Sequence, residues 1–126
     1  MRFLAIYKTA ERGVAPTPAQ METMGRFIEE ISKAGVLLET GGCLPSVQGA
    51  RVRLSGGKVT VTDGPFTESK ELVAGYALLQ CKDRDEAVEW TKRFLKAAGD
   101  GESEIRQLYE AGECVPQAES RLEAAV

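Results

Sequence analysis

The chain of 126 residues carries a net charge of −3 and contains 43% hydrophobic and 28% charged residues. This balance is typical of a soluble globular domain and excludes disordered, collagen-like and membrane-protein compositions. No basic field is present to neutralise phosphates, so we expect no direct contact with nucleic acid. The length fits a single domain over residues 1–126, with a core at about 1–110 and a C-terminal tail at 111–126.

The first predicted elements are a strand and a helix. Residues 2–7 form a short apolar run that is typical of a covered strand. The helix start is marked by Thr17 as N-cap, Pro18 at the first helical position and Gln20 three residues after the cap. Apolar residues at helical spacing predict one buried stripe: Met21, Met24, Ile28, Ile31 and Ala34. Gly35 is expected to end this helix.

The middle of the chain is predicted to be rich in strands. Residues 36–42 and 73–81 are apolar and read as single strands. Between them, residues 51–64 alternate apolar and polar positions on both sides of Gly56 and Gly57, which predicts a two-residue hairpin with one face in water. The apolar positions of this hairpin are Val52, Leu54, Val59 and Val61.

A second helix and a last strand are predicted in the final third. Asp83, with Glu86 three residues later, marks the helix start, and Gly99 marks its end. The apolar face of this helix is expected to comprise Ala87, Val88, Trp90, Thr91, Phe94, Leu95 and Ala98. Residues 103–110 are expected to form the last strand. The tail from Gly112 fits either a short helix or an arm against a partner.

Without the hairpin, the element order is strand, helix, strand, repeated once. This order predicts an α+β fold of the ferredoxin-like split βαβ type with an inserted β-hairpin. Both helices then cover one face of an antiparallel sheet, and the other face must meet an apolar surface or stay wet. The uninterrupted run from Phe3 to Ile6 favours a second copy of the chain as that surface. We therefore predict a homodimer whose sheets face each other.

Rare residue types limit the available chemistry. The absence of histidine removes Ser-His-Asp and Cys-His nucleophile activation and histidine-based metal sites. Cys43, Cys81 and Cys114 are widely spaced and form neither a disulfide framework nor a CxxC site, which fits a reducing cytoplasm. The apolar run at the start is too short for a secretory or membrane segment. We expect a cytoplasmic protein with no bound metal and no cofactor.

The run Asp63-Gly64-Pro65-Phe66 and the residues after it resemble the DGPF-type branch of the YCII-related family. The matching later positions are Glu68, Lys70, Glu71, Gly75 and Tyr76. The segments AGVLLETGGCLP, ARVRLSGGKVTVTDGPF and DEAVEW also match, so the resemblance covers roughly residues 1–109. It implies a dimeric α/β barrel of ferredoxin-like subunits. It also implies, for some members, an association with extracytoplasmic-function sigma factors.

For the wider family the resemblance implies a His-Asp pair in a cleft, of which only Asp63 has a counterpart in this chain. One interpretation makes Asp63 to Phe66 a structural corner, because Asp starts turns, Gly accepts positive φ, Pro fixes φ and Phe anchors the turn. The other makes Asp63 a general base at the mouth of a cleft. Both interpretations are open at the level of sequence.

Several neighbours could complete a ligand site. Tyr7 and Tyr76 carry a polar tip on an apolar body and fit either a pocket wall or a packed core or dimer face. Glu39 could share the cleft with Asp63 or point into solvent. Phe66 and Lys70 follow Asp63 closely and are included in the predicted ligand site.

Other polar residues of this region are weaker candidates. Arg51 and Arg53 fit the wet face of the hairpin or a site for an anion. A hard-cation site of Glu39, Asp63, Glu68 and Glu71 lacks any EF-hand spacing, and we do not predict it.

Two functions therefore compete. In the first, a small cytoplasmic homodimer binds a small organic ligand near Asp63, with acid-base chemistry as an open extension. In the second, the chain is a non-catalytic regulatory or protein-interaction module that contacts a protein such as a sigma factor. The sequence does not decide whether the chain is an enzyme.

Overall fold

The computed structural model describes residues 1–110. The elements along this range are β1 Arg2–Thr9, α1 Pro18–Lys33, β2 Leu37–Gly42, the 3-10 turn η1 Ser46–Gln48, β3 Ala50–Ser55, β4 Lys58–Asp63, β5 Leu72–Gln80, α2 Arg84–Ala98 and β6 Glu102–Gln107. The predicted tail at 111–126 lies outside the described residues.

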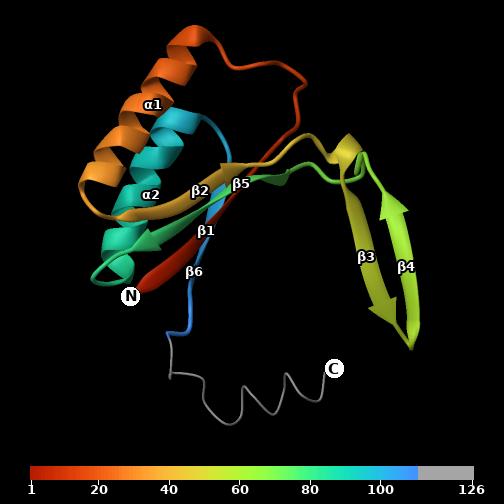
Figure 1. The fold of residues 1–126 in the computed structure, drawn as a ribbon. Coiled ribbons are helices and arrows are strands. Elements are labelled where there is room, and N and C mark those ends of the chain that lie inside the picture. The colour runs from red at the N-terminus through yellow and green to blue at the C-terminus, as the bar shows by residue number, and fades with distance from the viewer. Residues whose placement is uncertain (111–126) are drawn as a thin grey trace.

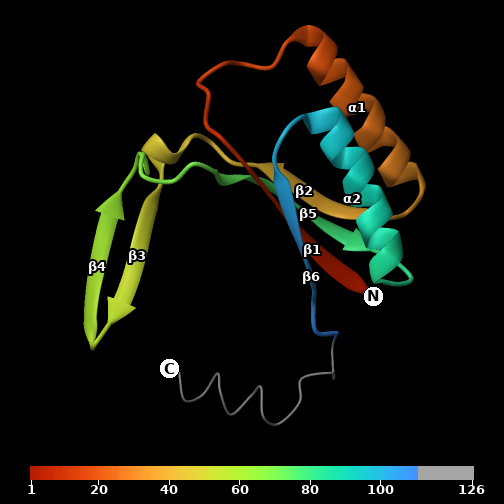
Figure 2. The ribbon, with the colours of Figure 1, turned by 180° about the vertical axis from the view of Figure 1, so that it is seen from behind.

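The main sheet has the strand order β2-β5-β1-β6, and each neighbouring pair is antiparallel. Both helices lie on one side of this sheet, as Figures 1 and 2 show. The predicted α+β class is confirmed, and the strand order is that of the split βαβ unit, because β5 lies between β1 and β2. The opposite side of the sheet carries no helix within residues 1–110, and we call it the helix-free face.

Local signals place the helix ends as predicted. The Thr17 side chain accepts a hydrogen bond from the Gln20 backbone N–H, and the Gln20 side chain accepts one from the Thr17 N–H. The Asp83 carboxylate accepts from the Glu86 N–H at 2.9 Å in the same way. Gly35, with φ of +73°, follows the end of α1. These caps satisfy backbone donors that a helix start would otherwise leave unpaired.

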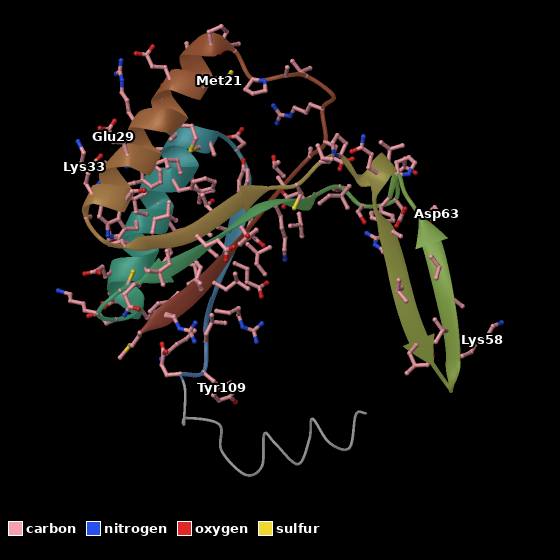
Figure 3. All side chains as sticks on the ribbon, viewed as in Figure 1. Met21, Glu29, Lys33, Lys58, Asp63 and Tyr109 are labelled. Atoms are coloured by element: carbon pink, nitrogen blue, oxygen red, sulfur yellow. The ribbon has the colours of Figure 1, made fainter. Side chains whose placement is uncertain are left out.

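The core lies between the helices and the sheet. Its buried apolar residues are Phe3, Ala5, Phe27, Ile31, Val36, Leu79, Cys81 and Ala87. The predicted stripe of α1 is partly wrong, because Met21 is 61% exposed whereas Phe27 is buried. Met21 lies in the first turn of α1, at the end that extends beyond the strands (Figure 3). The stripe that reaches the core therefore begins at Met24.

Residues 50–63 form a separate two-stranded sheet, which we call the arm. The predicted register is confirmed: Ser55 pairs with Lys58 across Gly56 and Gly57, both of which have positive φ. The prediction of a single wet face is wrong, because every residue of β3 and β4 is exposed. Figures 1 and 2 give the reason: the arm leaves the domain at one end of the sheet and points to the side opposite the helices.

No helix among residues 1–110 is long and apolar enough to cross a membrane.

Candidate functional site

Asp63 lies at the base of the arm, where β4 ends, and Lys58 lies at the arm's tip (Figure 3). Asp63 is exposed and pairs with Ala50 of β3. Asp63 lines neither of the two cavities described below.

The corner that follows Asp63 is packed tightly against η1. A Cβ on Gly64 would lie 1.6 Å from the carbonyl oxygen of Ser46, so only glycine fits. The Gly64 N–H donates to the Gly49 carbonyl at 3.0 Å, and the Gly64-Pro65 peptide is cis. The Phe66 N–H donates to Ser46 Oγ at 3.2 Å. The corner therefore joins the end of β4 to η1 through backbone contacts.

A carboxylate outside the motif completes this junction. Glu11, in the segment between β1 and α1, accepts hydrogen bonds from the Ser46 N–H at 2.6 Å and from Ser46 Oγ at 2.8 Å. Ser46 is a buried residue and bridges Glu11 to the Phe66 N–H. Neither Glu11 nor Ser46 was singled out from the sequence, because no local pattern connects residues 35 positions apart.

Arg51 covers the corner from the arm side. Its guanidinium lies 4.0 Å from the centre of the Phe66 ring, pairs with Glu68 and donates to Ser69 Oγ at 3.2 Å. A backbone hydrogen bond at Glu68 and the Arg51 guanidinium hold the pKa of Glu68 below its usual value. Arg51 thus has three partners within the chain, which favours a structural role over recognition of an anion.

A hollow of about 500 Å³ lies beside the corner. It is lined by Glu11, Cys43, Ser46, Arg51 and Phe66, among others. Its charged lining residues already have partners, Glu11 with Ser46 and Arg51 with Glu68, so the hollow offers few free polar contacts.

The second cavity, about 440 Å³, lies between the helices and the sheet, and we call it the interlayer cavity. It is lined mostly by apolar side chains: Ala5, Met24, Phe27, Ile28, Ile31, Leu37, Ala74, Ala77, Leu79, Trp90 and Phe94. Its polar positions are Tyr7, Thr40, Tyr76, Thr91 and Ser103. No lysine, arginine, aspartate or glutamate of the described chain lines it.

Most hydroxyl groups that line the interlayer cavity already have a hydrogen-bond partner. Tyr7 donates to the Asp100 carbonyl at 3.1 Å, and Thr40 donates to the Tyr76 carbonyl at 2.9 Å. Thr91 donates to the carbonyl four residues earlier at 2.8 Å. Ser103 differs, because its Oγ is buried and has no hydrogen-bond partner within residues 1–110. An unpaired buried hydroxyl costs free energy, so this oxygen is a position where a bound molecule would gain a hydrogen bond.

Packing fixes the wall that carries Tyr7. Its ring meets Phe94 edge to face, with centroids 5.1 Å apart. A Cβ on Gly101 would lie 2.6 Å from the Tyr7 ring, so the glycine makes room for it. Ser103 pairs with Tyr7 across β1 and β6, and the two side chains therefore share the face of the sheet that looks toward the helices.

Tyr76 and Glu39 lie together on the other face. Ala77 belongs to the core side of β5, so the alternation of strand residues directs the Tyr76 side chain to the helix-free face. The charge of Glu39 raises the pKa of the Tyr76 hydroxyl above its usual value. The Tyr76 ring also covers Gly41, where a Cβ would come within 2.9 Å of it.

The predicted ligand residues therefore do not gather in one place. Tyr7 and Tyr76 both border the interlayer cavity, although the Tyr76 side chain points to the other face. Phe66 lines the hollow at the corner, whereas Asp63 and Lys70 are exposed and line neither cavity.

No metal site is built by the described chain. Within residues 1–110, no group of three or more cysteine, aspartate or glutamate side chains is placed to hold a metal ion.

Two known proteins and one family model are similar to the chain. The chain is 36% identical over 84 residues to the uncharacterised protein R00369 of Rhizobium meliloti (strain 1021), a match that covers 64% of this chain and 68% of that protein. Among solved structures, it is similar to the 5-chloro-2-hydroxyhydroquinone dehydrochlorinase TftG of Burkholderia phenoliruptrix AC1100, in complex with 2,5-dihydroxybenzoquinone. That match has a TM-score of 0.49 and 12% identity, and covers 86% of this chain and 93% of that one. The model of the YCII-related domain matches residues 1–111, and the chain therefore belongs to the YCII-related family.

Proposed function

We propose that the protein binds a small, uncharged organic molecule about the size of one ring in the interlayer cavity. The observation that carries this proposal is the Ser103 hydroxyl, which is buried in the cavity wall without a partner. A hydroxyl or carbonyl group on the ligand would supply the missing hydrogen bond.

Volume and polarity support the same ligand class. The cavity, at about 440 Å³, lies within the range of roughly 300 to 1,000 Å³ that is usual for small-molecule sites. Its described lining has no charged side chain, and a buried ionised group without a partner is strongly disfavoured. The rings of Phe27, Trp90 and Phe94 favour a flat apolar body.

Binding, without acid-base catalysis by Asp63, is the function that this geometry supports best. A general base must come within hydrogen-bonding reach of the proton that it takes. Asp63 lies at the base of the arm and does not line the interlayer cavity. The ionisable residues among the described lining are Tyr7 and Tyr76, and the Tyr76 side chain points away, to the helix-free face. The catalytic role of Asp63 stays a prediction.

We also propose that two copies associate through their helix-free faces, as in a dimeric α/β barrel. By alternation, Leu4 and Ile6 of β1 and Leu78 of β5 lie at the centre of this face. Glu104 and Arg106 lie on the same face along the edge strand β6 and form an ion pair. An apolar centre with a charged rim is the usual anatomy of a protein interface. The cytoplasmic location and the sigma-factor partner stay predictions.

The ligand proposal is tested by NMR with the full chain. Trp90 is the only tryptophan and lines the cavity, so its indole N–H gives one signal that reports on occupancy. The probes are 4-methylphenol, 4-methylbenzoate and toluene. We expect saturable shifts with 4-methylphenol, and binding of the charged benzoate at least about tenfold weaker.

The variant Ser103→Ala isolates the hydrogen bond. It should weaken the binding of 4-methylphenol by about two- to twelvefold and leave the binding of toluene unchanged, since a neutral hydrogen bond contributes about 0.5 to 1.5 kcal/mol. Ser55→Ala, at the exposed end of β3, is the matched control. Equal affinity for the phenol and the benzoate, or no effect of Ser103→Ala on the phenol, would overturn the proposal.

A further inference from the structure

The arm exposes a continuous apolar face. Val52 pairs with Val61 and Leu54 pairs with Val59, so the four side chains lie together on one side of the ribbon. They are 71%, 62%, 67% and 61% exposed in that order. Scattered exposed apolar residues are normal, but a clustered set of this kind marks an interaction surface.

The arm lacks the contacts that would stabilise it on its own. Its two strands form a sheet that pairs with no third strand of residues 1–110. An isolated two-stranded hairpin is marginally stable in water unless its apolar face is covered. An exposed apolar ribbon is also a liability for aggregation. These facts call for a surface that covers Val52, Leu54, Val59 and Val61.

The base of the arm is nevertheless held firmly. Gly64 is locked against Ser46, and Arg51 is fixed between Phe66 and Glu68. The arm therefore leaves the domain in a defined direction, and Figures 1 and 2 show that this direction is the helix-free side. A second copy seated on the helix-free face would lie on the same side as the arm.

The apolar face of the arm matches surfaces that a second copy of this chain presents. Arg51, Arg53 and Lys58 lie on the opposite face of the arm, because they pair with Thr62, Thr60 and Ser55. The four apolar residues therefore need an apolar partner surface. A second copy presents two such surfaces, its own arm and the centre of its helix-free face, and the interface of a symmetric dimer joins the same surfaces of both copies.

The area that a stable interface covers also supports a second copy as the partner. The strand dimensions of about 4.8 Å by 3.3 Å per residue give the four-stranded face roughly 400 Å² and each arm face roughly 200 Å². A stable interface covers about 800 Å² on each partner. The sheet face alone reaches about half of that value. Each copy contributes its sheet face, its own arm and the surface that the partner's arm covers, and these three areas together reach about 800 Å².

We infer that each arm packs the apolar face formed by Val52, Leu54, Val59 and Val61 against a second copy of the chain, so that two arms clasp the dimer. The inference rests on the proposed homodimer and is independent of the ligand.

The test is the dimer dissociation constant of the full chain, measured by sedimentation velocity over a concentration series. In the first variant, Asn-Gly replaces residues 52–61, which joins the paired Arg51 and Thr62 by a two-residue turn and leaves the corner intact. We expect the dissociation constant to rise at least about 100-fold. The double variant Leu54→Ser with Val59→Ser should raise it at least about tenfold.

The matched control changes the other face of the same arm. Thr60→Ser with Thr62→Ser should leave the dissociation constant within about threefold, and circular dichroism of each variant verifies the fold. A wild-type dimer that the shortened arm leaves unchanged overturns the arm contact alone. A wild-type chain that stays monomeric up to about 100 μM overturns the arm and the proposed dimer together. Ligand shifts at Trp90 are read separately, so failure of the ligand proposal remains distinguishable.

Discussion

Substitution of Gly64 by alanine tests whether the corner after Asp63 is an architectural junction. A Cβ at this position would lie 1.6 Å from the Ser46 carbonyl oxygen and 2.6 Å from its carbonyl carbon. Both atoms are backbone, so no side-chain rotation relieves the contact. The corner and η1 must therefore move apart by about 2 Å to restore van der Waals distance.

The expected cost follows from what that displacement breaks. Overpacking of a tight contact costs about 1 to 3 kcal/mol, and each backbone hydrogen bond that is lost adds about 1 kcal/mol. The bonds at risk are those from the Gly64 N–H to Gly49 and from the Phe66 N–H to Ser46. We predict that Gly64→Ala lowers the free energy of unfolding by about 3 to 5 kcal/mol.

Urea unfolding at one fixed protein concentration measures this loss, because dimerisation makes stability depend on concentration. Gly25→Ala in α1 is the matched control: its added Cβ would meet no atom within 4 Å, and alanine favours a helix. The control should gain about 0.5 to 1 kcal/mol. If Gly64→Ala unfolds within about 0.5 kcal/mol of wild type, the corner is not the rigid junction described above.

Three further predictions follow from the perturbed groups. Glu39→Gln should lower the pKa of Tyr76, because the Glu39 charge is the main cause of its rise; ultraviolet titration of wild type and variant measures the change, and identical curves would contradict it. Hydrogen bonds from neighbouring cations lower the pKa of Glu104 below 4.5, so this group adds stability above that pH and loses it as the pH falls through the lowered value. The melting temperature of Glu104→Gln should accordingly lie below wild type at pH 7 and converge with it in acid; a gap that persists in acid would exclude this cause. Burial raises the thiol pKa of Cys81 to about 11, so iodoacetamide at pH 8 should label the exposed Cys43 before Cys81, as peptide mass analysis can show; faster labelling of Cys81 would contradict its burial.

The elements that could be predicted from sequence are those set by neighbours along the chain. The Thr17 and Gln20 capping box and the Gly56-Gly57 turn each depend on a few adjacent residues, and both form as predicted. The assignment of Met21 to the core failed because helical spacing gives a face but not the point where the helix passes the end of the sheet.

The candidate site could not be predicted from the sequence for a related reason. Ser103 lies opposite Tyr7 only because β6 pairs with β1, and a single serine in a strand carries no pattern of its own. Glu11 reaches Ser46 across 35 positions of sequence. Asp63 drew attention because its motif is local, yet the arm carries it away from the interlayer cavity. Sequence patterns report local geometry, whereas this cavity depends on contacts between distant segments.

The central claim is that the ligand occupies the interlayer cavity and not the corner at Asp63. A crystal structure of the protein with 4-methylphenol tests it most directly. We expect the phenol ring among Phe27, Trp90 and Phe94, with its oxygen about 2.8 Å from Ser103 Oγ. Density for the phenol beside Asp63, with the interlayer cavity empty, would contradict the proposal.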